Sequence, residues 1–134
     1  MDYIKYAYIA LIGWGVWAIG SKVLSHHLNS VSISFWISSW SLLFLLFYLL
    51  FSKDSLQFNH YSLCAIPIGF VSLIAILAFY QALKNGPASV VVPLTNLYVI
   101  FPVLYGFLIL REPPTISRLL GIGFALAASI LLTR

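Results

Sequence analysis

The chain has 134 residues, of which 62% are hydrophobic and 7% charged, and its mean hydropathy is +1.03. Soluble domains are about half apolar and a quarter charged, so this composition excludes a soluble globular protein and predicts a polytopic membrane protein. The formal charge of +4 comes from basic residues that stand singly, which leaves no basic patch for nucleic acid.

The first predicted span, residues 3–24, carries Trp14, Trp17 and Ser21 at helical spacing on one face. Two interpretations of the tryptophans stay open: they anchor packing or the interface, or they line a solute path. Lys22 near the end of the span either snorkels to the headgroups or meets an anionic group of a solute. The N-terminus lacks a basic lead-in and a small-residue cleavage site, so we expect this helix to be retained.

The second predicted span, residues 31–51, is rich in serine and tryptophan in its first half and almost purely Leu and Phe in its second. A serine hydroxyl can bond to a carbonyl of its own helix, so serines in a membrane helix are often no evidence of a cavity. Their mixture with tryptophans nevertheless favours a cavity wall, with Ser38 as the candidate. A polar loop then leads to the third span, residues 63–83, which holds Tyr80 near its end.

The fourth predicted span, residues 90–110, is long enough to cross about 30 Å of hydrocarbon, yet it contains Pro93 and Asn96. Proline removes a backbone donor and asparagine adds an amide, so both need a protein or water partner at membrane depth. We therefore expect a cavity here, lined by Asn96 and Tyr98. A breaker cluster at residues 84–87 predicts a short turn that places this span antiparallel to the third.

The fifth predicted span, residues 116–132, presents Gly121, Ala125 and Ser129 at four-residue spacing. Small residues four apart allow close contact between helices, which is a main source of association in lipid. We expect this face to form a dimer interface. The alternative is that it packs only within the subunit.

No catalytic or metal-binding constellation is visible in the sequence. The three histidines fall in predicted loops without the spacing of a metal site, and a single cysteine excludes an internal disulfide. The carboxylates fall in loops or at helix ends, and we expect Glu112 to be structural, capping a helix or pairing near Arg111 or Arg118. We therefore expect no enzyme activity, no cofactor and no metal.

One stretch resembles a known family. Residues 79–132 combine a Gly-Pro-Ala-Ser turn at residues 86–89, Pro93-Leu94, a glutamate that closes the fourth helix, and a glycine-led fifth helix. This order is similar to the end of an EamA domain, the repeating unit of the drug/metabolite transporter superfamily, and residues 13–22 more loosely resemble its opening helix. The family often has proline directly after the Leu-Tyr pair. Here Val99 follows, and the next proline is Pro102, which moves the expected kink almost one turn later.

The resemblance implies an all-α membrane protein: a single EamA-like domain over residues 1–134, whose five transmembrane helices form one half of a ten-helix inverted-repeat transporter. It implies a subunit that moves a small organic metabolite or drug by alternating access. The alternative function is a non-transporting membrane partner or assembly subunit. For the solute we expect aromatic walls with a few hydrogen-bonding groups, contributed by Trp14, Trp17, Ser38, Tyr80, Asn96 and Tyr98.

The basic residues at the predicted helix ends are almost evenly divided between the two sides of the membrane, so they set only a weak preference for one orientation of the chain. Four anchors fall on one side and three on the other: Lys5, Lys53, Arg111 and Arg118 against Lys22, Lys84 and Arg134. Because orientation follows this asymmetry in short loops, we expect dual topology in the lipid bilayer of the cell (inner) membrane. Two opposed copies would form an antiparallel homodimer; a similar five-helix chain of opposite bias would give a heterodimer.

Overall fold

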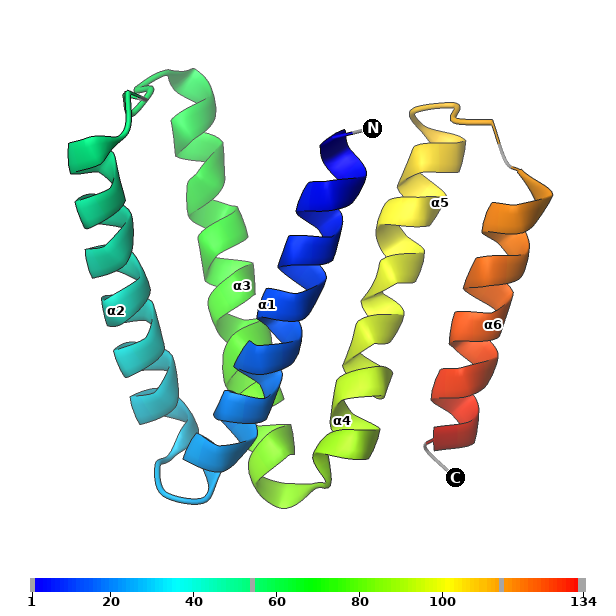
Figure 1. Cartoon of the computed structure of the whole chain (residues 1–134), viewed down its shortest axis with the longest axis horizontal. Helices are drawn as coiled ribbons and strands as arrows, with labels where there is room; N and C mark the ends of the chain where they lie inside the picture. Colours follow the sequence, from blue (N-terminus) through cyan, green and yellow to red (C-terminus); the bar gives the residue numbers. More distant parts are fainter. Residues whose placement is uncertain (1, 54, 114, 133–134) are drawn as a thin grey trace. The chain divides into compact units, whose positions relative to one another are not determined.

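The structure, a computed structural model, describes residues 2–53, 55–113 and 115–132, and the regular secondary structure in these residues is entirely helical (Figure 1). In chain order the helices are α1 (Asp2–Ser25), α2 (Ser30–Phe51), α3 (His60–Asn85), α4 (Ala88–Thr95), the 3-10 helix η1 (Asn96–Val99), α5 (Ile100–Leu108) and α6 (Ile116–Leu132). The predicted spans begin and end within three residues of these bounds. The fourth span differs in kind, because it consists of α4, η1 and α5 rather than one continuous helix.

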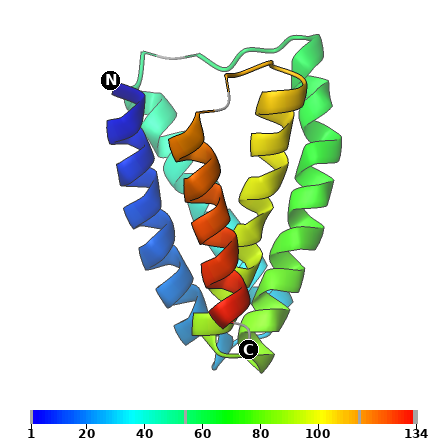
Figure 2. The ribbon, with the colours of Figure 1, turned by 90° about the vertical axis from the view of Figure 1, so that its right-hand side faces the viewer.

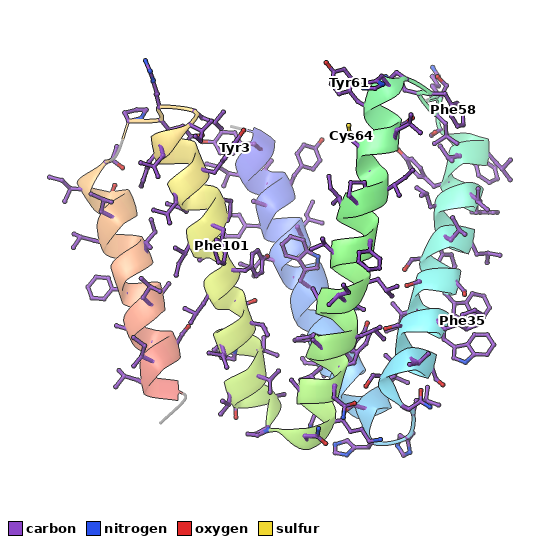
Figure 3. All side chains as sticks on the ribbon, turned by 180° about the vertical axis from the view of Figure 1, so that it is seen from behind. Tyr3, Phe35, Phe58, Tyr61, Cys64 and Phe101 are labelled. Atoms are coloured by element: carbon purple, nitrogen blue, oxygen red, sulfur yellow. The ribbon has the colours of Figure 1, made fainter. Side chains whose placement is uncertain are left out.

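The surface of these helices is apolar. Large side chains such as Leu50 and Phe101 are 79% and 75% exposed, and Figure 3 shows Phe35 pointing away from α2. Among the described residues, four helical stretches are long and apolar enough to cross a membrane, ending with Ala88–Leu108, and a shorter apolar helix follows at Leu119–Leu131. Exposed apolar surface on this scale requires lipid or a protein partner. The chain is an all-α, multi-pass membrane protein.

The helices form two compact units, residues 1–85 and residues 86–134. In the first unit, α1, α2 and α3 converge at the end that holds Ser25, Ser30 and Asn85 (Figure 1). Its buried side chains, which include Ile33, Tyr80 and Leu83, gather at this end. The turn into α2 is fixed by Asn29, whose side chain accepts a hydrogen bond of 2.8 Å from the amide of Ser32.

In the second unit, α6 runs back alongside the bent span α4–η1–α5 (Figures 1 and 2). Pro87 starts α4 with an extended backbone, and its carbonyl accepts from the amides of Val90 and Val91. At the other end of the span, Arg111 adopts a positive φ of 53°. This left-handed residue turns the chain so that the amide of Glu112 donates to the carbonyl of Gly106 at 3.0 Å.

Candidate solute-binding site

The break in the fourth span lies in its middle. Pro93 is inside α4, which ends at Thr95, and α5 resumes at Ile100 after the 3-10 turn. Pro102 falls in the first turn of α5, where a missing amide is tolerated because it would have no partner in that helix. The irregular turn precedes Pro102 and contains Tyr98, whose carbonyl is the one that the missing amide of Pro102 cannot meet. The position of the kink relative to the family pattern stays a prediction.

The carbonyls around the break are met by hydroxyl groups of the same unit. The Thr95 hydroxyl lies 2.9 Å from the Val91 carbonyl and 3.0 Å from that of Val92. The Ser129 hydroxyl donates to the carbonyl of Pro93 at 3.1 Å. These contacts supply protein partners of the kind that a broken helix needs in lipid.

Asn96 and Tyr98 both lie in the 3-10 turn η1. The backbone amide of Asn96 donates to the Val92 carbonyl, whereas its side chain is exposed and bonds to no described residue. Tyr98 is 56% exposed. An amide presented at mid-span needs a partner from outside the unit, because apolar lipid offers it none.

A groove of about 490 Å³ lies within the second unit, between η1–α5 and α6. Its walls are mostly apolar and carry one charged side chain, that of Glu112; the full lining is Val99, Pro102, Val103, Gly106, Phe107, Glu112, Gly121, Ile122 and Ala125. A Cβ atom added to buried Gly106 would lie 3.4 Å from the Glu112 carboxyl carbon, so the carboxylate rests on the glycine. None of the six predicted solute residues lines this groove.

The predicted dimer face is divided by the structure. Gly121 and Ala125 are exposed on the groove wall, whereas Ser129 is 7% exposed and bonded to Pro93. A Cβ atom added at Gly121 would meet no heavy atom within 4 Å. The first two positions thus leave room for another molecule, and Ser129 closes α6 onto α4 within the unit. Their role in a dimer stays a prediction.

In the first unit the structure brings Trp17 and Tyr80 together. The indole of Trp17 stacks on Phe79 at a centroid distance of 5.3 Å and lies tilted against Tyr80 at 5.9 Å. Tyr80 is 1% exposed, and the Ser21 hydroxyl lies beside its phenol. This cluster joins α1 to α3 and packs tightly, so any solute contact there requires the helices to move.

The other two candidates of the first unit do not join this cluster. Trp14 is 65% exposed, and Ser38 is exposed on α2. Buried hydroxyls are found elsewhere: Ser21 and Ser34 are 1% and 6% exposed, and neither oxygen has a hydrogen-bond partner of good geometry among the described residues. The serine-rich pattern of α2 indicated buried polar groups, but it did not single out Ser34.

The Lys22 side chain reaches across to α3. Its ammonium donates to the carbonyl oxygen of Leu83 at 2.6 Å, in the last turn of that helix. Nearby, the hydroxyl of Ser30 donates to the side-chain oxygen of Gln81 at 2.8 Å. Lys22 is therefore engaged as a cap on α3, which was not among the interpretations of its sequence position.

The groove was not predicted as a site. Glu112 was assigned a structural role, and its amide does close the end of α5; the side chain of Arg118 lies outside the described residues. The sequence did not indicate a role for Gly106. The structure shows the role, because the Glu112 carboxylate lies against the position that a Cβ atom would occupy. In the described part of the chain, no three His, Cys, Asp or Glu side chains are placed to hold a metal ion.

The chain belongs to the EamA-like transporter family, whose model matches residues 2–134. It is 27% identical over 119 residues to the uncharacterized transporter YetK of Bacillus subtilis (strain 168), a match that covers 85% of this chain and 36% of YetK. It is 38% identical over 56 residues to an uncharacterized transporter in the cobO 3′ region of Sinorhizobium sp., which covers 42% of this chain and 40% of that protein. No solved structure is detectably similar.

The aligned parts of this chain thus cover well under half of either relative that it matches. The chain is thus a multi-pass membrane protein of a transporter family, in agreement with the coarse function predicted from the sequence.

Proposed function

We propose that the chain is a transporter subunit that moves a small organic metabolite or drug by alternating access. The observation that carries the proposal is the 3-10 turn at Asn96–Val99 in the middle of the span Ala88–Leu108. Secondary transporters commonly build their sites from discontinuous helices near the bilayer midplane, where unwound backbone and polar side chains meet the solute. The exposed amide of Asn96 is such a group.

We further propose that two copies, inserted in opposite senses, make the working unit. The family match, and the alignment of 85% of this chain with only 36% of YetK, support the view that this chain corresponds to one repeat of a longer inverted-repeat transporter. The near balance of four against three anchoring charges supports insertion in both orientations. A heterodimer with a similar five-helix chain of opposite charge bias satisfies the same geometry.

The solute residues proposed for this transporter are Trp14, Trp17, Ser38, Tyr80, Asn96 and Tyr98. The contact between Trp17 and Tyr80 supports a shared aromatic wall from α1 and α3. The placement of Asn96 and Tyr98 in one exposed 3-10 turn supports a polar wall from the second unit. Trp14 and Ser38 have the weakest support, because each is exposed apart from these two groups.

A thermal-shift screen of the purified chain against a metabolite library tests the function. A solute that binds only the folded state stabilises it by about 2.7 kcal/mol at a hundred times its dissociation constant. We expect at least one solute to raise the melting temperature with concentration and to enter proteoliposomes that contain the protein. A chain that binds no solute and runs as a monomer in mild detergent would instead be a non-transporting partner or assembly subunit.

A further inference from the structure

We infer that the end of the first unit that holds Ser25, Ser30 and Asn85 is a gate, which opens and closes to water and is held closed by hydrogen bonds from α1 and α2 to α3. This inference rests on the proposed transport function and concerns the control of access to the solute path. Alternating access requires an end of the path that can close and open again. The contacts at this end and the exposure of the opposite end support the assignment.

Two hydrogen bonds between helices close this end. The Lys22 ammonium on α1 donates to the Leu83 carbonyl at 2.6 Å, and the Ser30 hydroxyl on α2 donates to the side-chain oxygen of Gln81 at 2.8 Å. Both acceptors lie in the C-terminal part of α3. We call these two bonds the latch, because together they hold α3 by one donor from each of the other two helices of the unit.

Burial in the first unit follows the same division. Every buried side chain that the structure describes in this unit belongs to residues 21–34 or 80–83, which lie at the latched end. At the opposite end of the same helices Tyr3, Leu50 and Tyr61 are exposed, and the helices diverge toward that end (Figures 1 and 2). Separation of the latched end would therefore open the side of the unit that is now closed.

The contacts that close the gate are of a kind that water can replace. The bond between Ser30 and Gln81 is exposed, so water competes for both groups. The buried hydroxyl of Ser34, one turn farther along α2, has no hydrogen-bond partner of good geometry among the described residues. Such a hydroxyl gains a partner when water reaches it, which favours the open state. The latch and this hydroxyl thus oppose each other, which keeps the two states close in free energy.

Opposed insertion of two copies would give each side of the membrane one such gate. The latched end of one copy would face the side from which the latched end of the other copy points away. One gate can then stay closed while the other opens, as alternating access requires.

Water access to position 34 measures the state of the gate. In a Cys64→Ser background, Ser34→Cys supplies the only thiol, and its reaction with the charged reagent trimethylammonioethyl methanethiosulfonate is followed on the purified full chain in mild detergent. Lys22→Met and Gln81→Ala each remove one bond of the latch. We expect the reaction rate to rise roughly tenfold and roughly fivefold, the factors that correspond to a lost hydrogen bond with and without a charged partner. Unchanged rates in both variants would overturn the inference.

Matched controls separate opening of the gate from loss of the whole fold. Val91→Cys places a comparably buried thiol in the second unit, and Lys22→Met should not change its reaction rate. Lys84→Met removes an exposed charge at the same end of the first unit and should leave the Ser34→Cys thiol as slow as before. Equal acceleration of the two thiols by Lys22→Met would indicate general unfolding and would contradict a gate.

A metal bridge tests the closed state directly. Ser30→His with Gln81→His replaces a hydrogen-bonded pair by two imidazoles, which are good ligands for nickel ions. Bound nickel should slow the reaction of the Ser34→Cys thiol about tenfold or more, because it binds the closed state alone, and a chelator should restore the rate. Nickel should have no effect when only Ser30→His is present. Nickel that binds the pair without slowing the reaction would overturn the inference, even if Lys22→Met does not fold.

Failure of the gate is distinct from failure of the proposed function. Solute uptake at full rate while nickel bridges the pair overturns the gate and leaves the transporter standing. Absence of binding and uptake for every solute overturns both.

Discussion

The ammonium of Lys22 on α1 donates a hydrogen bond of 2.6 Å to the carbonyl oxygen of Leu83 on α3. Leu83 is fully buried, and it lies in the last turn of α3, where carbonyls have no partner within the helix. A cation at this position also meets the negative end of the helix dipole. The contact ties the C-terminal ends of α1 and α3 together, at the end of the first unit where its small core lies.

Lys22→Met should destabilise the first unit. It keeps the apolar stem and removes the donor, so we expect a loss of about 1 to 3 kcal/mol, the range for a hydrogen bond to a charged group combined with a helix-end charge. The measurement is unfolding by denaturant in mild detergent. Lys84→Met is the matched control, because it removes the same charge from the same end of the unit at an exposed residue. Equal effects of the two variants would show that the cap contributes nothing.

Asn96→Leu should impair transport and leave folding intact. The backbone amide of Asn96 keeps its bond to Val92, and no described residue loses a partner of the side chain. If the side chain meets the solute, binding should weaken by about 1 to 3 kcal/mol, the cost of a lost polar partner in a buried site. Uptake into proteoliposomes checks this, with Phe101→Leu on the same span as the control. Unchanged uptake would mean that Asn96 serves packing between copies.

Gly121→Leu should separate the protomers if α6 forms the dimer interface. A Cβ atom added at this position would meet no heavy atom within 4 Å, and leucine has a higher helix propensity than glycine. A loss of association must therefore come from a clash with another molecule. Cross-linking yield and size in detergent are the readouts. A dimer that persists in the combined Gly121→Leu and Ala125→Leu variant would place the interface elsewhere.

The helices were predictable because hydropathy and breakers act locally. Pro, Gly and charged residues mark the turn at residues 84–87 and the end of the fourth span. The observed helices end close to these residues. The irregular turn at Asn96–Val99 lies between Pro93 and Pro102, the two prolines that mark this span in the sequence.

The sites were less predictable because they depend on contacts between helices. That Trp17 meets Tyr80 follows from how α1 packs on α3, and that Lys22 meets a backbone carbonyl cannot be read from its neighbours. The groove arises where small residues of α6 face α5, and Glu112 gains its position only when Arg111 turns the chain back. Patterns along one helix do not contain these pairings.

The charge balance predicts dual topology, and labelling from outside the cell tests it. In a Cys64→Ser background, His27→Cys places a single thiol in the loop before α2, and Ser55→Cys places one in the loop after it. Both positions are exposed. We expect each thiol to be labelled in a fraction of the molecules, because orientation is decided by few lysines and arginines. Labelling of only one of the two thiols would show a fixed orientation.

The most direct test of an antiparallel working unit is solute uptake by two oriented variants, alone and together. Ser55→Lys with Gln57→Lys should hold the loop after α2 in the cytoplasm, and His26→Lys with His27→Lys should hold the loop before α2 there. We predict that cells with either variant alone take up no solute and that co-expression restores uptake, since the pair again supplies one copy of each orientation. Full uptake by one variant alone would contradict the opposed pair of copies.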